Sequence, residues 1–272
     1  YLPTMNRSEI FLVMVSGMCT NAGSVMGTYI GMLGGTDPAA KVLFATHLLS
    51  ASVMAVPGSI VLAKMLCPQT EEATDHVAIS GKEKENSNIL DAISSGTVTG
   101  VKLMTNIAAM LLVFISLVAL ANYITEGVIG RYTGLNDWIV KITDGKAQGL
   151  TFQFILGVIT SPFMWLIGVP SQDIMLVGSL LGQKTILNEF VAYFQLQQWK
   201  DAGLFMYEKS ILMSTYVLCG FANISSIGIL LGGLGVLAPE KRGLISRIGV
   251  PAMIGGALVS VLSATIIGMI LG

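Results

Sequence analysis

The stretch Gly-Phe-Ala-Asn-Ile-Ser-Ser-Ile-Gly occupies residues 220–228, in the middle of an uncharged run from Ser210 to Pro239. A run of this length can cross a bilayer, because a membrane-spanning helix needs about 20 apolar residues. A second uncharged run, Ile10–Thr36, contains the comparable stretch Gly-Met-Cys-Thr-Asn-Ala-Gly-Ser-Val at residues 17–25. Both stretches place small and polar residues in mid-membrane, where apolar helix formers are expected. We therefore expect the helix to be interrupted at both places.

The composition of the chain indicates an integral membrane protein. Of the 272 residues, 53% are hydrophobic and 11% are charged, whereas a soluble domain carries about 25% charged residues. Three more uncharged runs, Val42–Ala63, Leu103–Thr125 and Ile248–Gly272, complete the candidate spans. None of them alternates polar with apolar residues as a membrane β-strand does. A net charge of −1 argues against a nucleic-acid partner, which needs a basic face. We expect an all-α polytopic protein in the lipid bilayer.

The predicted organisation has four parts. Residues 1–67 hold the end of a first repeat, with broken span one and span two. Residues 68–95 form a charged cytoplasmic loop, and residues 96–131 form a scaffold span. Residues 132–272 form a second repeat, with an interfacial helix, a re-entrant hairpin, a broken span and the last span.

The hairpin is expected within Ala147–Trp199, where prolines and the charged residues Lys184 and Glu189 interrupt the apolar sequence. Irregular backbone at membrane depth is tolerated only where protein or a water-filled cavity lines it. Ionisable residues inside a membrane are candidates for functional residues by default, and Glu189 is the preferred candidate here. The alternative for Glu189 and Lys184 is a buried ion pair, or side chains that extend to the membrane edge.

The paired interruptions themselves have two interpretations. Interrupted segments at corresponding positions of two halves are typical of the binding site of a secondary transporter, because an unwound turn frees carbonyls and amides. Small and polar residues also mediate helix packing in lipid. The sequence contains neither Gly-x-Ser-x-Gly nor His-Glu-x-x-His, so the motifs favour a protein that is not an enzyme. Without a Walker-type phosphate loop, an ion gradient is the expected source of energy.

Several strings resemble one known family. Residues 182–193 are Gly-Gln-Lys-Thr-Ile-Leu-Asn-Glu-Phe-Val-Ala-Tyr, and residues 219–228 and 237–242 contain Cys-Gly-Phe-Ala-Asn-Ile-Ser-Ser-Ile-Gly and Leu-Ala-Pro-Glu-Lys-Arg. These strings resemble the carboxy-terminal half of the concentrative nucleoside transporters. Ala-Gly-Ser-Val at 22–25 and Ala-Ser-Val-Met-Ala-Val-Pro-Gly at 51–58 extend the resemblance over essentially the whole chain.

The resemblance implies a role for each matching residue. It assigns a nucleoside-binding site in which Glu189 accepts hydrogen bonds from ribose hydroxyls, Asn223 and Ser226 complete the ribose site, and Phe221 and Val25 line the pocket. It assigns a sodium site to the Thr20 hydroxyl and the backbone carbonyl of Asn21, with a proton as the other possible coupling ion. A neutral nucleoside suits hydrogen-bond acceptors beside an apolar slot, and hard oxygens suit a small cation.

The expected function is therefore cation-coupled nucleoside import by alternating access, through a homotrimer with inverted repeats and an elevator-like motion. The location is an inner or plasma membrane. The alternatives are a non-transporting membrane assembly subunit with a gate-like repeat and a transporter of another small polar solute. The family's Gly-Gln-Thr-Glu-Ala-Pro string, which precedes the segment matching Tyr1-Leu2-Pro3, is absent from the sequence. We expect transport to require a longer chain that carries it. The preference for purine or pyrimidine nucleosides stays open.

Overall fold

The computed structural model describes residues 2–71, 88–143, 145 and 147–272, and within these ranges the chain is helical and contains no strand. This confirms the all-α prediction. The helices, in chain order, are η1 (Leu2–Thr4), α1 (Arg7–Cys19), α2 (Gly23–Gly34), α3 (Pro38–Leu66), α4 (Ile89–Asn122), η2 (Tyr123–Gly130), α5 (Arg131–Thr133), α6 (Leu135–Ile142), α7 (Phe152–Leu166), α8 (Ile174–Ile186), α9 (Glu189–Asp201), α10 (Glu208–Leu218), α11 (Ile224–Leu237), η3 (Pro239–Lys241) and α12 (Arg242–Ile270).

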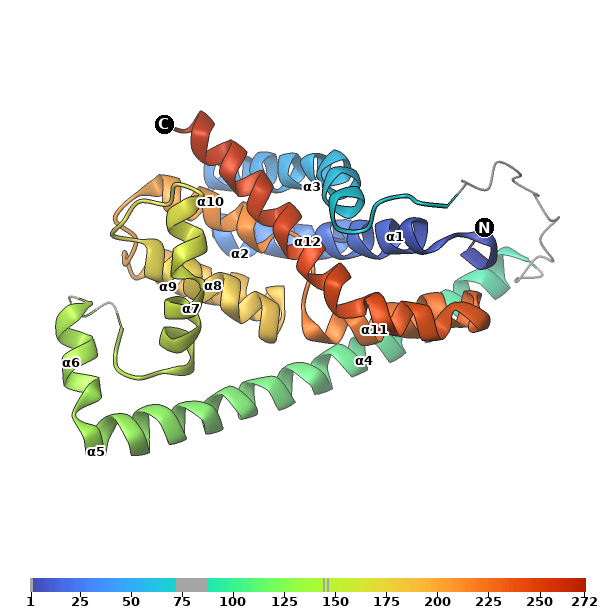
Figure 1. Cartoon of the computed structure of the whole chain (residues 1–272). Helices are drawn as coiled ribbons and strands as arrows, with labels where there is room; N and C mark the ends of the chain where they lie inside the picture. The colour runs from blue at the N-terminus through green and yellow to red at the C-terminus, as the bar shows by residue number, and fades with distance from the viewer. Residues whose placement is uncertain (1, 72–87, 144, 146) are drawn as a thin grey trace.

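The first predicted interruption separates α1 from α2, which lie end to end (Figure 1). Thr20 and Ala22 adopt extended backbone angles, so the helix stops at Cys19 and restarts at Gly23. The α1 helix begins with a capping box, in which Asn6 accepts from the Glu9 amide and the Glu9 carboxylate accepts from the Asn6 amide. Such a box satisfies two amides that a helix start leaves free.

The second interruption separates α10 from α11. Gly220 has a φ angle of +82°, and Asn223 is extended and caps α11 by accepting a hydrogen bond from the Ser226 amide. The predicted span Ser210–Pro239 is therefore two short helices joined at mid-length. Each broken pair is followed by one long helix, α3 or α12, and both of these are 29 residues long.

Three helical segments are long and apolar enough to cross a membrane, namely Arg7–Gly34, Pro38–Leu66 and Pro239–Ile270, judged on the described residues alone. The two long helices, α3 and α12, pack against each other and both contact α1. Apolar side chains of these helices, including Ile10, Met14, Met18, Ala55 and Ala252, are buried together. The protein is a multi-pass membrane protein.

The expected hairpin contains three helices rather than two arms. The α7 and α8 helices pack against each other, and Gly168 in the turn between them has a φ angle of +84°. The chain leaves helical geometry again at Leu187, and the Asn188 side chain caps α9 by accepting from the Val191 amide. This second reversal places Glu189 at the start of a helix.

The α4 helix stands apart from the rest of the bundle (Figure 1) and continues through the π-helical η2 to Gly130. Outside its own continuation, it makes its main contact with α7. Its first turns fall within residues 68–95, which we assign to the loop, and most of that loop, residues 72–87, lies outside the described residues.

The two interruptions meet at Gly220. A Cβ atom on Gly220 would lie 2.5 Å from the carbonyl carbon of Cys19 and 2.7 Å from the carbonyl oxygen of Met18. The Gly220 amide donates to the side-chain oxygen of Asn21 over 2.8 Å. Hence the end of α1 and the end of α10 are in direct main-chain contact.

We predict that Gly220→Ala lowers the free energy of unfolding by about 2–4 kcal/mol, because it combines a strained positive φ angle with overpacking against backbone. Gly228→Ala is the matched control, since a Cβ there meets nothing within 4 Å and alanine favours helix. Thermal melting in detergent measures both. Equal melting temperatures for the two variants would contradict the prediction.

Candidate functional site

Glu189 and Asn223 form the centre of the site. The Glu189 carboxylate is half-buried at the first position of α9 and accepts a hydrogen bond of 3.1 Å from the Asn223 amide nitrogen. Its other oxygen lies 3.4 Å from the Tyr29 hydroxyl. These side chains come from α2, α9 and the start of α11, so the fold brings together three helices that are distant in sequence.

Two helix starts converge on this carboxylate. Glu189 begins α9, and Asn223 is the residue that caps α11. The amino-terminal ends of helices carry partial positive charge, which stabilises a negative group placed there. The two helix starts can therefore stabilise the Glu189 carboxylate without a basic side chain in direct contact with it.

The Asn223 side chain has two simultaneous tasks. Its oxygen accepts from the Ser226 amide at 2.9 Å and from the hydroxyls of Ser225 and Ser226, while its nitrogen donates to Glu189. Asn223 and Ser226 are almost completely buried. The Ser226 hydroxyl also contacts the carbonyl oxygen of Phe221. Thus the structure gathers Glu189, Asn223 and Ser226, with the Phe221 backbone tied to the same network.

An aromatic wall lies beside the carboxylate. The rings of Tyr29 and Tyr193 stack with their centroids 4.0 Å apart, and Phe190 tilts against Tyr29 at 6.3 Å. The Tyr193 hydroxyl donates to the carbonyl of Thr215, which is buried. Sequence reasoning gave these tyrosines no role, although Tyr193 stands four residues after Glu189 in the same string. That spacing is about one helical turn and could have indicated a shared helix face.

The two remaining pocket residues are half-buried. Val25 packs against the buried cluster that contains Tyr29 and Tyr193, one turn before Tyr29 on α2. Phe221 lies in the break between α10 and α11. Both residues are therefore on the elements that carry Tyr29 and Asn223.

Thr20 and Asn21 occupy the break after α1. The Thr20 hydroxyl donates to the Ser16 carbonyl over 3.3 Å, which leaves the hydroxyl oxygen able to accept or coordinate. The Asn21 side chain is engaged with the other break, where its oxygen accepts from the Gly220 amide and its nitrogen approaches the Cys219 sulfur at 3.6 Å. The sequence pointed to the backbone of Asn21 and missed this side-chain role. The Thr20 hydroxyl and the main-chain carbonyls of this break are oxygen groups, the type of ligand that a hard cation prefers.

Lys184 is fully buried and its ammonium group contacts oxygen atoms. It donates to the carbonyls of Val217 and Cys219 and to the Ser260 hydroxyl, at 2.8–2.9 Å. Lys184 does not form the ion pair with Glu189 that the sequence left as an alternative, because its ammonium group contacts the end of α10.

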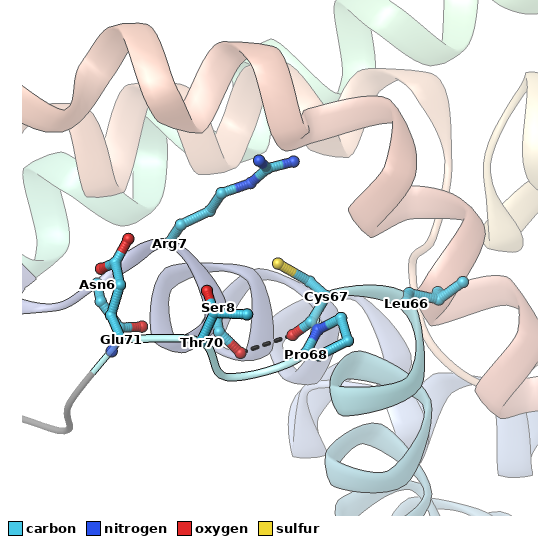
Figure 2. Close-up of a pocket in the computed structure, with 8 residues that line it drawn as sticks. All are labelled: Asn6, Arg7, Ser8, Leu66, Cys67, Pro68, Thr70 and Glu71. Atoms are coloured by element: carbon cyan, nitrogen blue, oxygen red, sulfur yellow. Dashed lines mark hydrogen bonds between the residues drawn. The ribbon is translucent and has the colours of Figure 1, made fainter.

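Two cavities lie elsewhere. One, of about 280 Å³, lies where α1 begins and α3 ends; Figure 2 shows Arg7 reaching over it and the Ser8 hydroxyl bonded to the Cys67 carbonyl. The other, of about 830 Å³, is lined by α7, α8, α9 and the region around η2. None of the seven predicted site residues lines either cavity. The candidate site is therefore a hydrogen-bonded cluster at the helix breaks.

Comparison with known proteins identifies close relatives. An uncharacterized transporter of Haemophilus influenzae is 38% identical over 275 residues, covering 100% of this chain and 61% of the relative. Sodium/nucleoside cotransporter 1 of Rattus norvegicus is 37% identical, covering 99% of this chain and 40% of the relative. Nucleoside permease NupC of Helicobacter pylori is 36% identical, covering 100% of this chain and 60% of the relative. The chain thus spans 40–61% of the length of these relatives.

Solved structures agree with the fold. The structure of CNTnw in an inward-facing substrate-bound state superposes with a TM-score of 0.82 at 36% identity, covering 99% of this chain and 58% of CNTnw. An outward-facing CNTnw variant gives a TM-score of 0.84. The profile of the family described as "Na+ dependent nucleoside transporter C-terminus" matches residues 47–268. The chain belongs to the Na+-dependent nucleoside transporter family and matches its carboxy-terminal part.

Proposed function

We propose that the protein to which this chain belongs imports nucleosides across a membrane together with sodium. The observation that carries the proposal is the pair formed by Glu189 and Asn223, a half-buried carboxylate held by an amide between two helix starts. The names of the relatives, which include sodium/nucleoside cotransporters and a nucleoside permease, support the same substrate class.

The pair has hydrogen-bonding capacity to spare. A carboxylate offers about four lone-pair positions, and Asn223 and Tyr29 use two of them. Ribose hydroxyls can donate to the others. The Asn223 nitrogen has a second N–H, which can donate to a ribose oxygen. Ser226 holds Asn223 in this orientation, and Phe221 and Val25 supply apolar surface for the base.

Thr20 and the Asn21 carbonyl would hold the cation. Sodium is favoured over a proton, because a threonine hydroxyl offers an oxygen ligand and does not titrate. Equal lengths of α3 and α12 after each broken pair support an inverted repeat. The separation of α4 from the bundle (Figure 1) supports a scaffold role in a homotrimer, with the remaining helices moving as a unit during alternating access.

Uptake of labelled uridine by liposomes containing the full-length protein tests the proposal. We expect saturable uptake that is driven by an inward sodium gradient. Absence of uridine uptake under this gradient would contradict it, and uptake of a different polar solute would point to another substrate class.

Glu189→Gln should weaken uridine binding by about 10- to 150-fold, because hydrogen bonds to a charged group contribute about 1.5–3 kcal/mol. Ribose-modified nucleosides lacking a hydroxyl should lose less affinity than uridine. Glu208→Gln is the control, since Glu208 also begins a helix but is exposed. Calorimetric affinities measure the effect, and a Glu189→Gln affinity within twofold of wild type would remove Glu189 from the ribose site.

Asn223→Ser should separate capping from binding. Serine still caps a helix but lacks the amide that donates to Glu189, so we expect a near-normal melting temperature and at least tenfold weaker uridine binding. Asn223→Ala removes the cap as well as the amide donor, so we expect both a lower melting temperature and weaker uridine binding. Asn88→Ser, at the exposed cap of α4, should change neither. If Asn223→Ser binds uridine normally, Asn223 serves helix packing only.

Thr20→Val should raise the sodium concentration needed for half-maximal uridine uptake. Because the two binding events are linked, uridine affinity at a fixed, sub-saturating sodium concentration should also fall. The factor by which sodium strengthens uridine binding must equal the factor by which uridine strengthens sodium binding, in the variant as in wild type. Thr46→Val is the matched control, because the Thr46 hydroxyl likewise donates to the carbonyl four residues earlier but is exposed on α3. Uridine uptake that does not depend on sodium but is driven by a pH gradient would indicate proton coupling instead.

A further inference from the structure

The environment of Lys184 resembles that of a bound cation. Its side chain is 0% exposed, and its nitrogen lies 2.8–2.9 Å from three oxygen atoms, of Val217, Cys219 and Ser260. A buried charge is costly unless it is fully hydrogen-bonded. This one has an acceptor for each of its three N–H groups, and two of the acceptors are main-chain carbonyls.

The hydrogen-bond directions are consistent with a protonated amine. The Ser260 hydroxyl lies 2.5 Å from the Cys219 carbonyl and 3.3 Å from that of Gly256, so it donates to these oxygens. Its own oxygen is then free to accept from Lys184. Carbonyl oxygens cannot donate, so all three contacts of the lysine nitrogen require N–H groups on the lysine.

The two carbonyls belong to the end of α10, where the helix is interrupted. A helix end leaves its last carbonyls without partners and carries partial negative charge. In membrane transporters, unwound carbonyls and the ends of half-helices are the groups that coordinate a small cation. The lysine ammonium therefore occupies a position whose chemistry suits an inorganic cation.

The two breaks differ in this respect. At the end of α1, the Thr20 hydroxyl and main-chain oxygens are available, and no basic side chain among the described residues donates to them. At the end of α10, the equivalent oxygens hold Lys184. The two ends are in contact through Gly220 and Asn21.

We propose that Lys184 is a tethered cation, which fills at the α10 break the place that sodium takes at the α1 break. The comparison with sodium rests on the proposed cation site at Thr20 and Asn21. It follows that only the α1 break exchanges its cation during transport, whereas the α10 break carries a permanent charge. Shortening the side chain should open the α10 oxygens to an external cation.

The test is the melting temperature of the full-length protein in detergent without nucleoside, in choline, sodium or ethylammonium chloride at equal ionic strength. Lys184→Met keeps the bulk without the charge, and we expect its melting temperature to fall by about 5 °C or more in all three salts. We expect the melting temperature of Lys184→Ala to fall by a similar amount in choline chloride. In ethylammonium chloride at least half of this loss should be recovered. Sodium chloride should raise the melting temperature of Lys184→Ala more than it raises that of wild type. Lys209→Ala, which removes an ammonium bonded to the Gly272 carbonyl, should respond to salts as wild type does.

Several results would overturn the proposal. One is a Lys184→Met protein that melts within 1 °C of wild type, and another is a Lys184→Ala protein with the same deficit in all three salts. A Lys209→Ala protein whose melting temperature rises in sodium and in ethylammonium as much as that of Lys184→Ala also counts against the proposal. The sodium site is tested separately. If sodium does not change the melting temperature of wild type, but ethylammonium raises that of Lys184→Ala, the assignment of a cation site to Thr20 is refuted. The role of Lys184 as a tethered cation is then retained.

Discussion

Main-chain groups freed where a helix breaks inside a bilayer must find partners within the protein, because lipid offers none. This constraint organises the region around the two interruptions. The Gly220 amide is satisfied by the Asn21 side chain, and the carbonyls of Val217 and Cys219 by the Lys184 ammonium. Main-chain groups at the α10–α11 break are therefore satisfied by side chains from two other parts of the chain, Asn21 in the α1–α2 break and Lys184 on α8.

The same requirement places the polar groups of the candidate site. Asn223 caps α11 with its oxygen, which leaves its nitrogen facing Glu189 at the start of α9. Helix capping and the proposed nucleoside contact are thus compatible uses of one side chain. The tyrosine pair at 4.0 Å closes one side of this cluster, so that the carboxylate is ordered by contacts from three helices.

The sequence predicted the positions of both breaks, because glycine and asparagine are poor helix formers and stand out inside an apolar run. It also singled out Glu189 and Asn223, which the structure brings within hydrogen-bonding distance. It did not predict the contacts of Tyr29, the side chain of Asn21 or the acceptors of Lys184. These depend on partners 160, 199 and 33–76 residues away, and no local pattern specifies such pairs. The third helix of the hairpin was missed because the change at Leu187 and Asn188 involves only two residues.

The separation of 199 residues between Asn21 and Gly220 has a consequence for how the protein is made. Chains are synthesised at about 5–20 residues per second, so roughly 10–40 s pass between the appearance of the two partners. During that interval the end of α1 exists without its contact to Gly220, and the Asn21 side chain has not yet met the Gly220 amide. Contacts so distant in sequence form late and slowly. The candidate site therefore cannot be complete before α10 and the start of α11 have been made, and α1 and α2 must persist in the membrane without these contacts until then.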